Sequence, residues 1–340
     1  MTTLVTGAAG FFGQQMVRRY LEIGRTVTAL DSSEERLRGI SEKGVRVIAR
    51  DLKTRFTKEE VADLKNIRTI IHAASVSSPF SLLPKPVLAD LNLETTRTLI
   101  QLAEDVGAAR FVFISTPQVY TCLEDQYLLH ETTPLPPPLG ALAQMKTQAE
   151  QEILTRLGRG TVVLRPQCVY GPGDPLLVPA LLDLVRSGSV PLFRGGAAET
   201  DFTHVEDLVD AVLAAERTRS AAARIFNISG GNPLQVKRFI DRIAAASGLE
   251  PRWRKAALPA AKSAVRIAEA RSAITGHKSP PRLTRSLLAF LAFSQTHDIS
   301  RAKAHLGWTP RHGIDEGLDA LASWIAADGA GAGAEGVRQS

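Results

Sequence analysis

The sequence predicts an α/β protein: a doubly wound parallel sheet with a smaller, mostly helical C-terminal lobe. Three observations predict this class. Short β-branched runs alternate with longer helical patterns through residues 1–165, a glycine-rich turn separates the first run from the first helical pattern, and the alternation becomes irregular after Pro166. Such alternation implies parallel strands joined by crossover helices, and strands covered on both faces are continuously apolar.

The strands expected in the first half are Thr2–Thr6, Thr26–Leu30, Val45–Ile48, Thr69–His72, Phe111–Ser115 and Thr161–Leu164. The helices expected between them are Phe12–Ile23, Leu88–Val106 and Leu142–Leu157. A proline-rich stretch, Pro134–Pro138, predicts a stiff loop before the last of these helices. Further along, Val205–Arg217 predicts a helix capped by His204, and Ile225–Ile228 a strand that returns to the main sheet.

These elements divide the chain into two lobes. A sheet domain is expected over residues 1–165, with residues 201–228 returning to it. Residues 166–200 and 229–325 form the expected substrate-binding lobe, and Gly171–Asp174 is the expected hinge. Residues 326–340 contain an Ala-Gly-Ala-Gly stretch that is too weakly apolar to pack, so we expect a disordered tail.

Length and composition bound the class of protein. With 340 residues, of which 44% are hydrophobic and 22% charged, the chain can bury a large core. No apolar run reaches the roughly 18 residues that span a bilayer, and the first residues lack the basic region of a signal peptide. The two cysteines, Cys122 and Cys168, imply no disulfide framework. We expect a soluble, cytoplasmic protein.

The net charge of +6 is unevenly distributed. Between Arg217 and Arg311, 18 lysines and arginines stand against four acids, a balance of +14 that leaves −8 for the remainder. A basic lobe is typical of proteins that attract an anionic substrate, a phosphopantetheine-bearing carrier or a membrane surface, and equally of an arginine-rich solvated surface. The sequence shows neither an aromatic ladder nor metal-ligand spacing, so we expect no nucleic acid partner and no metal.

Three glycines, Gly7, Gly10 and Gly13, follow the first strand with the spacing G-x-x-G-x-x-G. They permit a sharp turn, close approach of a pyrophosphate, and close packing of the helix on the strand. The phosphates would meet free N–H groups and the positive end of the helix dipole. Asp31 ends the second strand, where its carboxylate can accept hydrogen bonds from the adenosine ribose and would repel a 2′-phosphate. We therefore expect a Rossmann-type domain that binds NAD rather than NADP.

Further motifs follow in order: Asp51-Leu52, HAAS from His72, NLETT from Asn92, STPQVY from Ser115, LRPQCVYGPGD from Leu164, DFTHVEDLVDA from Asp201 and LGWTP from Leu306. Together with the TGAAGFFG loop, they resemble the extended short-chain dehydrogenases/reductases, in the NAD-dependent epimerase/dehydratase and 3β-hydroxysteroid dehydrogenase-like group. The resemblance extends to about Ile325. It implies NAD as the cofactor, a small-molecule substrate and a homodimer.

The resemblance also implies which residues contact the coenzyme. They are Gly7, Ala9, Gly10, Phe11, Phe12, Gly13, Asp31, Asp51, Leu52, Ala73, Ala74, Ser75, Lys146, Pro166 and Val169. Within this set, the Asp51-Leu52 pair is expected at the adenine, and the segment from Pro166 to Val169 at the nicotinamide.

In this family a Ser/Thr, a Tyr and a Lys four residues after the Tyr carry the chemistry. By resemblance, Thr116 matches the Ser/Thr, Lys146 the lysine and Asn92 a supporting asparagine. Leu142 stands where the tyrosine is expected, and no tyrosine of this chain has a lysine four residues on. Proton transfer by a placed side chain is typically worth about 10²–10⁴ in rate. Ordinary interconversion of alcohol and ketone should therefore be slow in this protein.

Several alternatives follow from the missing tyrosine. Another group can supply the proton, and the candidates are Tyr127, His130, Gln144 and Cys168. The reaction can also need no tyrosine, as in conjugate reduction, or in a redox-neutral epimerase, lyase, isomerase or cyclase. The third alternative is a catalytically inactive NAD-binding regulator. We favour an oxidoreductase of atypical mechanism.

Two features bear on the substrate. By resemblance, members that act on nucleotide sugars place an arginine just before the Asp-Phe pair that begins here at Asp201, and this chain has Thr200 instead. The run Arg282–Phe293 (RLTRSLLAFLAF) is apolar, and we interpret it as a buried helix, with a pocket lid or a membrane contact as alternatives. We expect an apolar substrate, acyl- or polyketide-like, either free or bound to a carrier or CoA, rather than a nucleotide sugar.

Overall fold

The computed structural model describes residues 2–75, 80, 89–218, 225–274 and 282–328. Its central sheet has seven parallel strands in the order β12-β7-β5-β4-β1-β2-β3. They are β1 (Thr2–Thr6), β2 (Val27–Asp31), β3 (Arg46–Ala49), β4 (Ile67–His72), β5 (Arg110–Ile114), β7 (Thr161–Pro166) and β12 (Ile225–Ile228). All seven were predicted from the sequence, and the predicted Rossmann-type sheet is confirmed.

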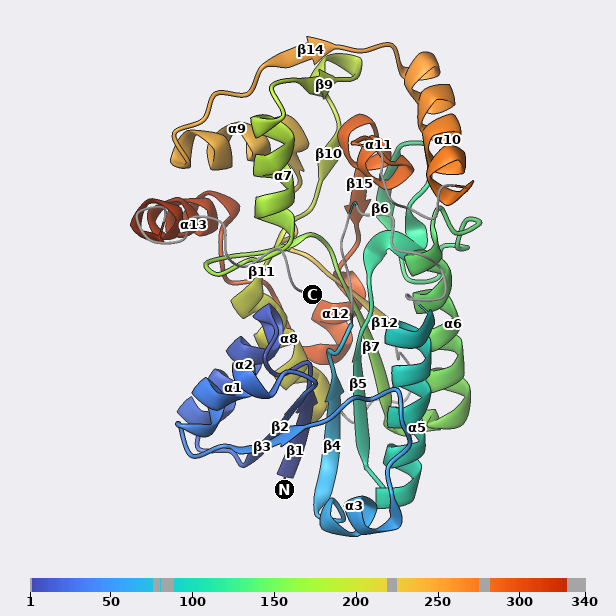
Figure 1. Cartoon of the computed structure of the whole chain (residues 1–340), viewed down its shortest axis with the longest axis vertical. Helices are drawn as coiled ribbons and strands as arrows, with labels where there is room; N and C mark the ends of the chain where they lie inside the picture. The colour runs from blue at the N-terminus through green and yellow to red at the C-terminus, as the bar shows by residue number, and fades with distance from the viewer. Residues whose placement is uncertain (1, 76–79, 81–88, 219–224, 275–281, 329–340) are drawn as a thin grey trace.

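Helices cover both faces of this sheet (Figure 1). The helices on one face are α1 (Phe11–Glu22), α2 (Glu34–Ser41), α8 (Val205–Arg217) and α12 (Ser300–Leu306). Those on the other face are α3 (Lys58–Asp63), the π-helix η1 (Ala89–Glu94), α5 (Thr95–Val106) and α6 (Ala141–Arg156). The helix predicted over Leu88–Val106 is thus two helical segments, and residue 88 lies outside the described residues.

The apolar spacing of α1 and α6 explains how they sit on the sheet. In α1, the buried residues Gly13, Met16, Val17 and Tyr20 follow the three-and-four spacing of one helix face. The buried face of α6 has the same spacing, but it includes Lys146 and Glu150 among its apolar residues. Charged side chains are rarely buried unless they are paired, so this face carries chemistry as well as packing.

The strand order creates a crevice at one edge of the sheet. β1 pairs in parallel with β2 on one side and with β4 on the other, so the order in which strands are added to the sheet reverses between β1 and β4. Ligands of such folds bind outside the carboxyl ends of the strands at this switch point. In Figure 1 the second lobe lies beyond these carboxyl ends, and it therefore closes the crevice from the other side.

The second lobe has its own hydrophobic core. Its helices are α7 (Leu177–Arg186), α9 (Val236–Ala246), α10 (Leu258–Ile274), α11 (Arg285–Ala292) and α13 (Ile314–Asp328). Its short strands are β6 (Gln126–Leu129), β8 (Val169–Tyr170), β9 (Val190–Leu192), β10 (Glu199–Thr200), β11 (Thr203–His204), β13 (Leu234–Gln235), β14 (Trp253–Lys255) and β15 (Gln295–His297). Three-residue to four-residue 3₁₀ turns complete the fold: η2 (Pro117–Tyr120), η3 (Gly158–Gly160) and η4 (Arg194–Gly196).

Two further predictions concern this lobe. Residues 326–328, at the start of the predicted tail, belong to α13, and residues 329–340 lie outside the described residues. The apolar run from Arg282 contains α11, which Thr284 caps by accepting a hydrogen bond from the Leu287 amide. Throughout the described parts of the chain, every helix is too short or too polar to cross a membrane.

Candidate active site

The glycine loop leaves no room for side chains at two positions. Gly7 has a φ of +67°, and a Cβ there would lie 2.8 Å from the backbone of Ala74. A Cβ at Gly13 would approach the Gly7 carbonyl oxygen to 2.0 Å. Only glycine therefore allows the turn to lie this close to α1 and to the end of β4. The bare backbone of the loop stands at the amino end of α1, where N–H groups and the helix dipole favour a phosphate.

Asp31 connects the end of β2 to this loop. One oxygen of its carboxylate accepts a hydrogen bond from the Ala9 amide at 3.0 Å, and the other from the Ser33 amide at 3.1 Å. The half-buried carboxylate is thereby fixed beside the loop. Arg36 lines the cavity that begins at this loop, whereas Asp31 is not among the described residues that line it.

A cavity of about 640 Å³ runs from the glycine loop to the second lobe. Most of the predicted coenzyme contacts line it: Gly7, Gly10, Phe11, Phe12, Gly13, Ala73, Ser75, Lys146, Pro166 and Val169. Thr116 also lines it. Ten of the fifteen predicted coenzyme contacts and two of the three predicted reaction-site residues, Thr116 and Lys146, thus line one cavity.

Other predicted residues are not among the described residues that line the cavity. Leu52 is buried in the core below the sheet, and the half-exposed Asp51 side chain pairs with Lys53 at 3.2 Å. Asn92 is 2% exposed, and its side-chain oxygen accepts a hydrogen bond from the Ser75 hydroxyl at 2.7 Å. Asn92 thus supports the cavity wall from behind Ser75.

Lys146 is 3% exposed, yet it lines the cavity. Its Nζ donates a hydrogen bond to the Ile114 carbonyl oxygen at 3.2 Å and lies 4.7 Å from the centre of the Phe113 ring. Burial lowers the pKa of Lys146 to about 8, while the Glu150 carboxylate raises it. An ammonium group with this pKa can release its proton near neutral pH.

Leu142 lies one helical turn before Lys146 and is 7% exposed. It packs in the hydrophobic core with Leu93 and Met145, and it is absent from the described residues that line the cavity. An apolar side chain gains free energy by leaving the cavity for the core. The position at which the sequence resemblance implies a proton donor therefore serves packing here.

Of the four replacement donors predicted from the sequence, Cys168 lines the cavity. Burial, assisted by the negative charge of Asp201, raises the pKa of Cys168 to about 12. Tyr127 is 61% exposed, and Gln144 is exposed on α6. His130 bonds to Thr132, and none of these three is among the described lining residues.

A buried polar network lies behind Thr116 and Lys146. The Ser115 hydroxyl, which reaches the cavity, donates to Glu150 at 2.5 Å. Arg165 binds both oxygens of Glu150, at 3.0 and 2.5 Å, and also donates to the Tyr120 hydroxyl. Paired in this way, the two buried charges satisfy each other and fix α6 against β7.

His72 has a structural role beside the loop. Its ring nitrogens bond to the side chains of Thr6, at 3.1 Å, and Thr96, at 2.9 Å. Burial and the charge of Lys146 hold the pKa of His72 well below its usual range. The neutral ring therefore ties β4 to β1 and α5.

The second-lobe end of the cavity is apolar. Its wall includes Phe80, Leu176, Leu177, Ala289, Phe290 and Phe293. The rings of Phe80 and Phe290 lie 5.2 Å apart, so a described residue from the first quarter of the chain contacts α11 here. Along α11, Ser286, Ala289 and Phe290 face the cavity, whereas Leu287 and Leu288 enter the core. The predicted apolar helix is thus part of the core and part of the pocket wall.

Asp174, Gln118 and Gln295 also line this cavity, although the sequence did not single them out as site residues. The Asp174 carboxylate accepts three backbone N–H bonds, from Leu176, Leu177 and Val178, at 2.8 to 3.1 Å. It therefore holds the start of α7. The GPGD motif could have predicted this role for Asp174, because an aspartate before an apolar helical run commonly caps the helix.

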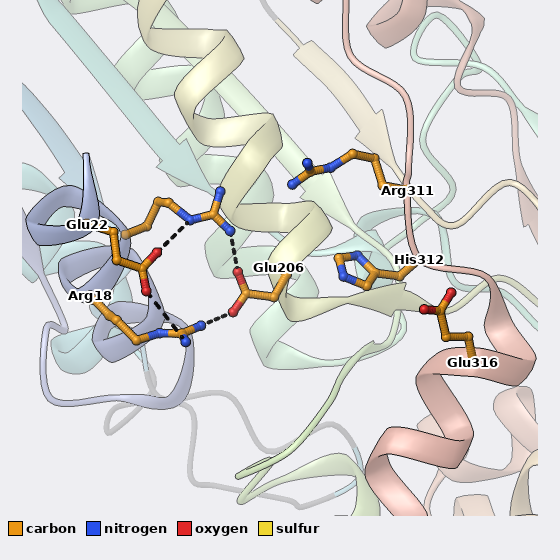
Figure 2. A pocket seen from close by; sticks show the side chains of 7 residues that line it. Arg18, Glu22, Glu206, Arg311, His312 and Glu316 are labelled. Atoms are coloured by element: carbon orange, nitrogen blue, oxygen red, sulfur yellow. Dashed lines mark hydrogen bonds and ion pairs between the residues drawn. The ribbon is translucent and has the colours of Figure 1, made fainter.

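A second hollow, of about 420 Å³, lies between α1, α8 and the segment before α13 (Figure 2). Figure 2 shows Arg18 beside Glu22 and Glu206, and Arg19 also pairs with both acids. Across the hollow, Arg311 pairs with Asp210. These charges neutralise one another at the surface, and the hollow contains none of the glycine loop. The larger cavity is therefore the candidate active site.

Residues 3–229 match the NAD dependent epimerase/dehydratase family. The chain belongs to this family. It is similar to the 2-alkyl-3-oxoalkanoate reductase of Stenotrophomonas maltophilia, with 29% identity over 96% of this chain and 100% of the relative. It is also similar to the 4-hydroxy-2-methyl-3-oxo-4-farnesyl-3,4-dihydroquinoline-1-oxide ketoreductase of Stigmatella aurantiaca, with 27% identity over 94% and 96% of the two chains.

Among solved structures, MoeE5 in complex with UDP-glucuronic acid and NAD superposes with a TM-score of 0.73. Its identity is 26%, over 96% of this chain and 100% of MoeE5. The coenzyme of this family fits the residues present here, because the loop at Gly7 and Gly13 is bare and Asp31 stands at its side. The chain is an NAD-dependent enzyme of the oxidoreductase type that acts on a small molecule.

Proposed function

We propose that this enzyme uses NAD(H) to reduce the oxo group of an apolar small molecule, without a tyrosine proton donor. The observation that carries the proposal is the apolar wall opposite the glycine loop, where Leu176, Phe290 and Phe293 face the cavity. Burial of an alkyl or acyl chain against such a wall contributes about 0.8 kcal/mol per CH₂ group. A nucleotide diphosphate would instead need cationic partners there.

The charges around the cavity support the same substrate class. Its described basic residues, Arg36 and Lys146, both belong to the coenzyme side. Thr200, at the position of the arginine expected for nucleotide sugars, is 2% exposed and accepts a hydrogen bond from Gln167 at 2.6 Å. By their names, the two relatives reduce an oxo group in molecules that carry an alkyl or farnesyl chain. These observations favour an acyl- or polyketide-like ketone, either free or bound to a carrier or CoA.

The roles of the site residues belong to the same proposal. Thr116 accepts a hydrogen bond from the Gln118 amide, which leaves its own O–H able to donate to the substrate oxygen. Lys146 would hold the nicotinamide ribose, and Asn92 would hold Ser75 in the wall. Bound NADH supplies the hydride. The loop residues and Asp31 would bind its phosphates and adenosine ribose.

The test uses purified enzyme with NADH and matched substrate panels. One panel contains 3-oxoacyl compounds of increasing chain length and apolar enones, and the other contains UDP- and dTDP-sugars. We expect net NADH consumption with the first panel, and a KM that falls as the chain lengthens. Turnover of sugar nucleotides would contradict the proposal. Product without net NADH consumption would indicate a redox-neutral epimerase or isomerase, and NAD binding without turnover on either panel would indicate a regulator.

A pair of variants tests where the alkyl or acyl chain of the substrate binds. Phe290→Ala removes part of the apolar wall and should raise KM for long-chain substrates by about tenfold, with little change for short ones. Ile267→Ala, at a residue of α10 that is 68% exposed, is the control and should change neither. The homodimer expected from the resemblance is tested on the same samples by size-exclusion chromatography with light scattering.

A further inference from the structure

We propose that the Lys146 ammonium group is itself the proton donor, giving its proton directly to the substrate oxygen as hydride reaches the carbonyl carbon. This inference rests on the proposed reductase function. It identifies the group that donates the proton in place of the tyrosine expected at residue 142. It follows from where the protic side chains lie around the cavity and from the packing of Leu142 in the core.

The other described acids around the cavity are poorly placed for this task. Asp174 has both carboxylate oxygens bound to backbone amides of α7. Glu124 is an exposed residue between Cys122 and β6. Cys168 lies just before β8, near Thr200 and Asp201, and its thiol is a weak acid. Lys146 instead belongs to the wall that contains Ser115 and Thr116.

The surroundings of Nζ leave it able to donate. Of the three N–H bonds of the ammonium, one is directed to the Ile114 carbonyl oxygen. That oxygen belongs to the residue two positions before Thr116, so Lys146 and Thr116 bracket the same end of β5. A carbonyl oxygen held by the Thr116 hydroxyl can therefore meet a second N–H of Lys146. Hydrogen-bond reach is the first requirement of a general acid.

The charged groups around Lys146 suit proton release. On its own helix it faces Glu150, which is bound by Arg165 from β7, and Arg165 in turn contacts Tyr120 from η2. On β4 it faces His72, whose low pKa keeps the ring neutral. Burial lowers the pKa of Lys146 to about 8. The ammonium is therefore present at neutral pH and is a far stronger acid than an ordinary lysine.

The step balances in atoms and charge. The hydride of NADH forms a C–H bond at the carbonyl carbon, and the π electrons of the C=O bond move to oxygen. The oxygen takes the proton from Lys146, whose N–H electron pair stays on nitrogen as the neutral amine. The alcohol leaves, and the amine regains a proton from solvent. The nicotinamide is oxidised by two electrons and the ketone is reduced by two.

The test compares Lys146→Arg with Cys168→Ala in the full-length enzyme. Arginine keeps the positive charge that binds the ribose but cannot release a proton at accessible pH. We expect wild-type kcat for ketone reduction to fall as pH rises through about 8. In Lys146→Arg, kcat should drop about 100-fold or more, and this pH limb should disappear, while the Kd for NADH changes only a few-fold. In Cys168→Ala, kcat should still fall as pH rises through about 8.

Two measurements distinguish a failure of the donor role from a failure of the reductase function. The pKa of Lys146 is measured independently of turnover, from the pH dependence of its acylation followed by mass spectrometry, and should lie near 8. A pKa above 10, or a Lys146→Arg enzyme with the wild-type rate and pH limb, would overturn the donor role and leave the reductase function standing. A wild-type enzyme that reduces no oxo compound would overturn both.

Discussion

The Ala9 amide donates a hydrogen bond to the Asp31 carboxylate across 3.0 Å, so the glycine loop and the end of β2 hold one another in place. This bond fixes a negative charge where the adenosine ribose of the coenzyme is expected. It also explains how a single aspartate can favour one coenzyme: the same oxygens that accept hydroxyl protons repel a phosphate.

Asp31→Asn should weaken NADH binding by about tenfold or more and reduce the preference over NADPH, because the amide loses the negative charge but keeps one acceptor oxygen. The measurement is the Kd of each coenzyme by calorimetry. Asp51→Asn is the matched control, since the Asp51 side chain is half-exposed and pairs with Lys53. An equal loss in the control would indicate that the adenine lies against Asp51, as the sequence resemblance implies.

Gly13→Ala should abolish coenzyme binding and cost about 1–3 kcal/mol of stability. The added Cβ would lie 2.0 Å from the Gly7 carbonyl oxygen, so the loop must move. Gly39→Ala in α2 adds the same methyl group where no atom lies within 4 Å, and should raise stability by about 0.5–1 kcal/mol. Urea unfolding and NADH titration check both variants. A Gly13→Ala protein with wild-type affinity would contradict this account of the loop.

Leu142→Tyr should raise ketone reduction by about tenfold or more, because a phenol one helical turn before Lys146 restores a placed proton donor. The tyrosine must leave the core position of Leu142 to reach the cavity, so the melting temperature should fall. Steady-state rates and calorimetry provide the comparison. A folded variant that binds NADH without any gain in rate would show that the pocket no longer accommodates a phenol.

His204 should make the protein sensitive to acid. Burial and the neighbouring His312, whose ring lies 4.2 Å away, lower the pKa of His204 to about 4. The unfolded chain, with an ordinary histidine pKa near 6.5, then binds more protons than the folded state between these values. Stability is therefore full above pH 6.5 and decreases as pH falls toward 4, by about 3 kcal/mol from this group alone.

His204→Asn tests this dependence. Asparagine can keep the cap that His204 provides for α8 by accepting from the Glu206 amide, but it does not titrate. Urea unfolding at pH 4.5 and 7 should show a smaller pH difference in the variant than in the wild type. An unchanged difference would assign the acid sensitivity to other groups.

The sequence predicted the structural features that depend on residues close together in the chain. The spacing of Gly7 and Gly13 predicts the turn that the structure contains, and Val205–Arg217 is helical over the predicted residues with His204 as its cap. The burial of Leu142 could not be predicted from the sequence, because it depends on how α6 packs in a core that also contains Leu93 from a distant part of the chain. The contact between Phe80 and Phe290 could not be predicted either, since it joins segments far apart in the chain.

The bidentate pairing of Arg165 with Glu150 has a consequence for how this chemistry can be altered. Because the clamp fastens α6 to the sheet one turn after Lys146, the helix does not depend on residue 142 for its alignment. A designer could therefore add or withdraw a phenol at residue 142 with some loss of melting temperature, while the clamp keeps α6 aligned on the sheet.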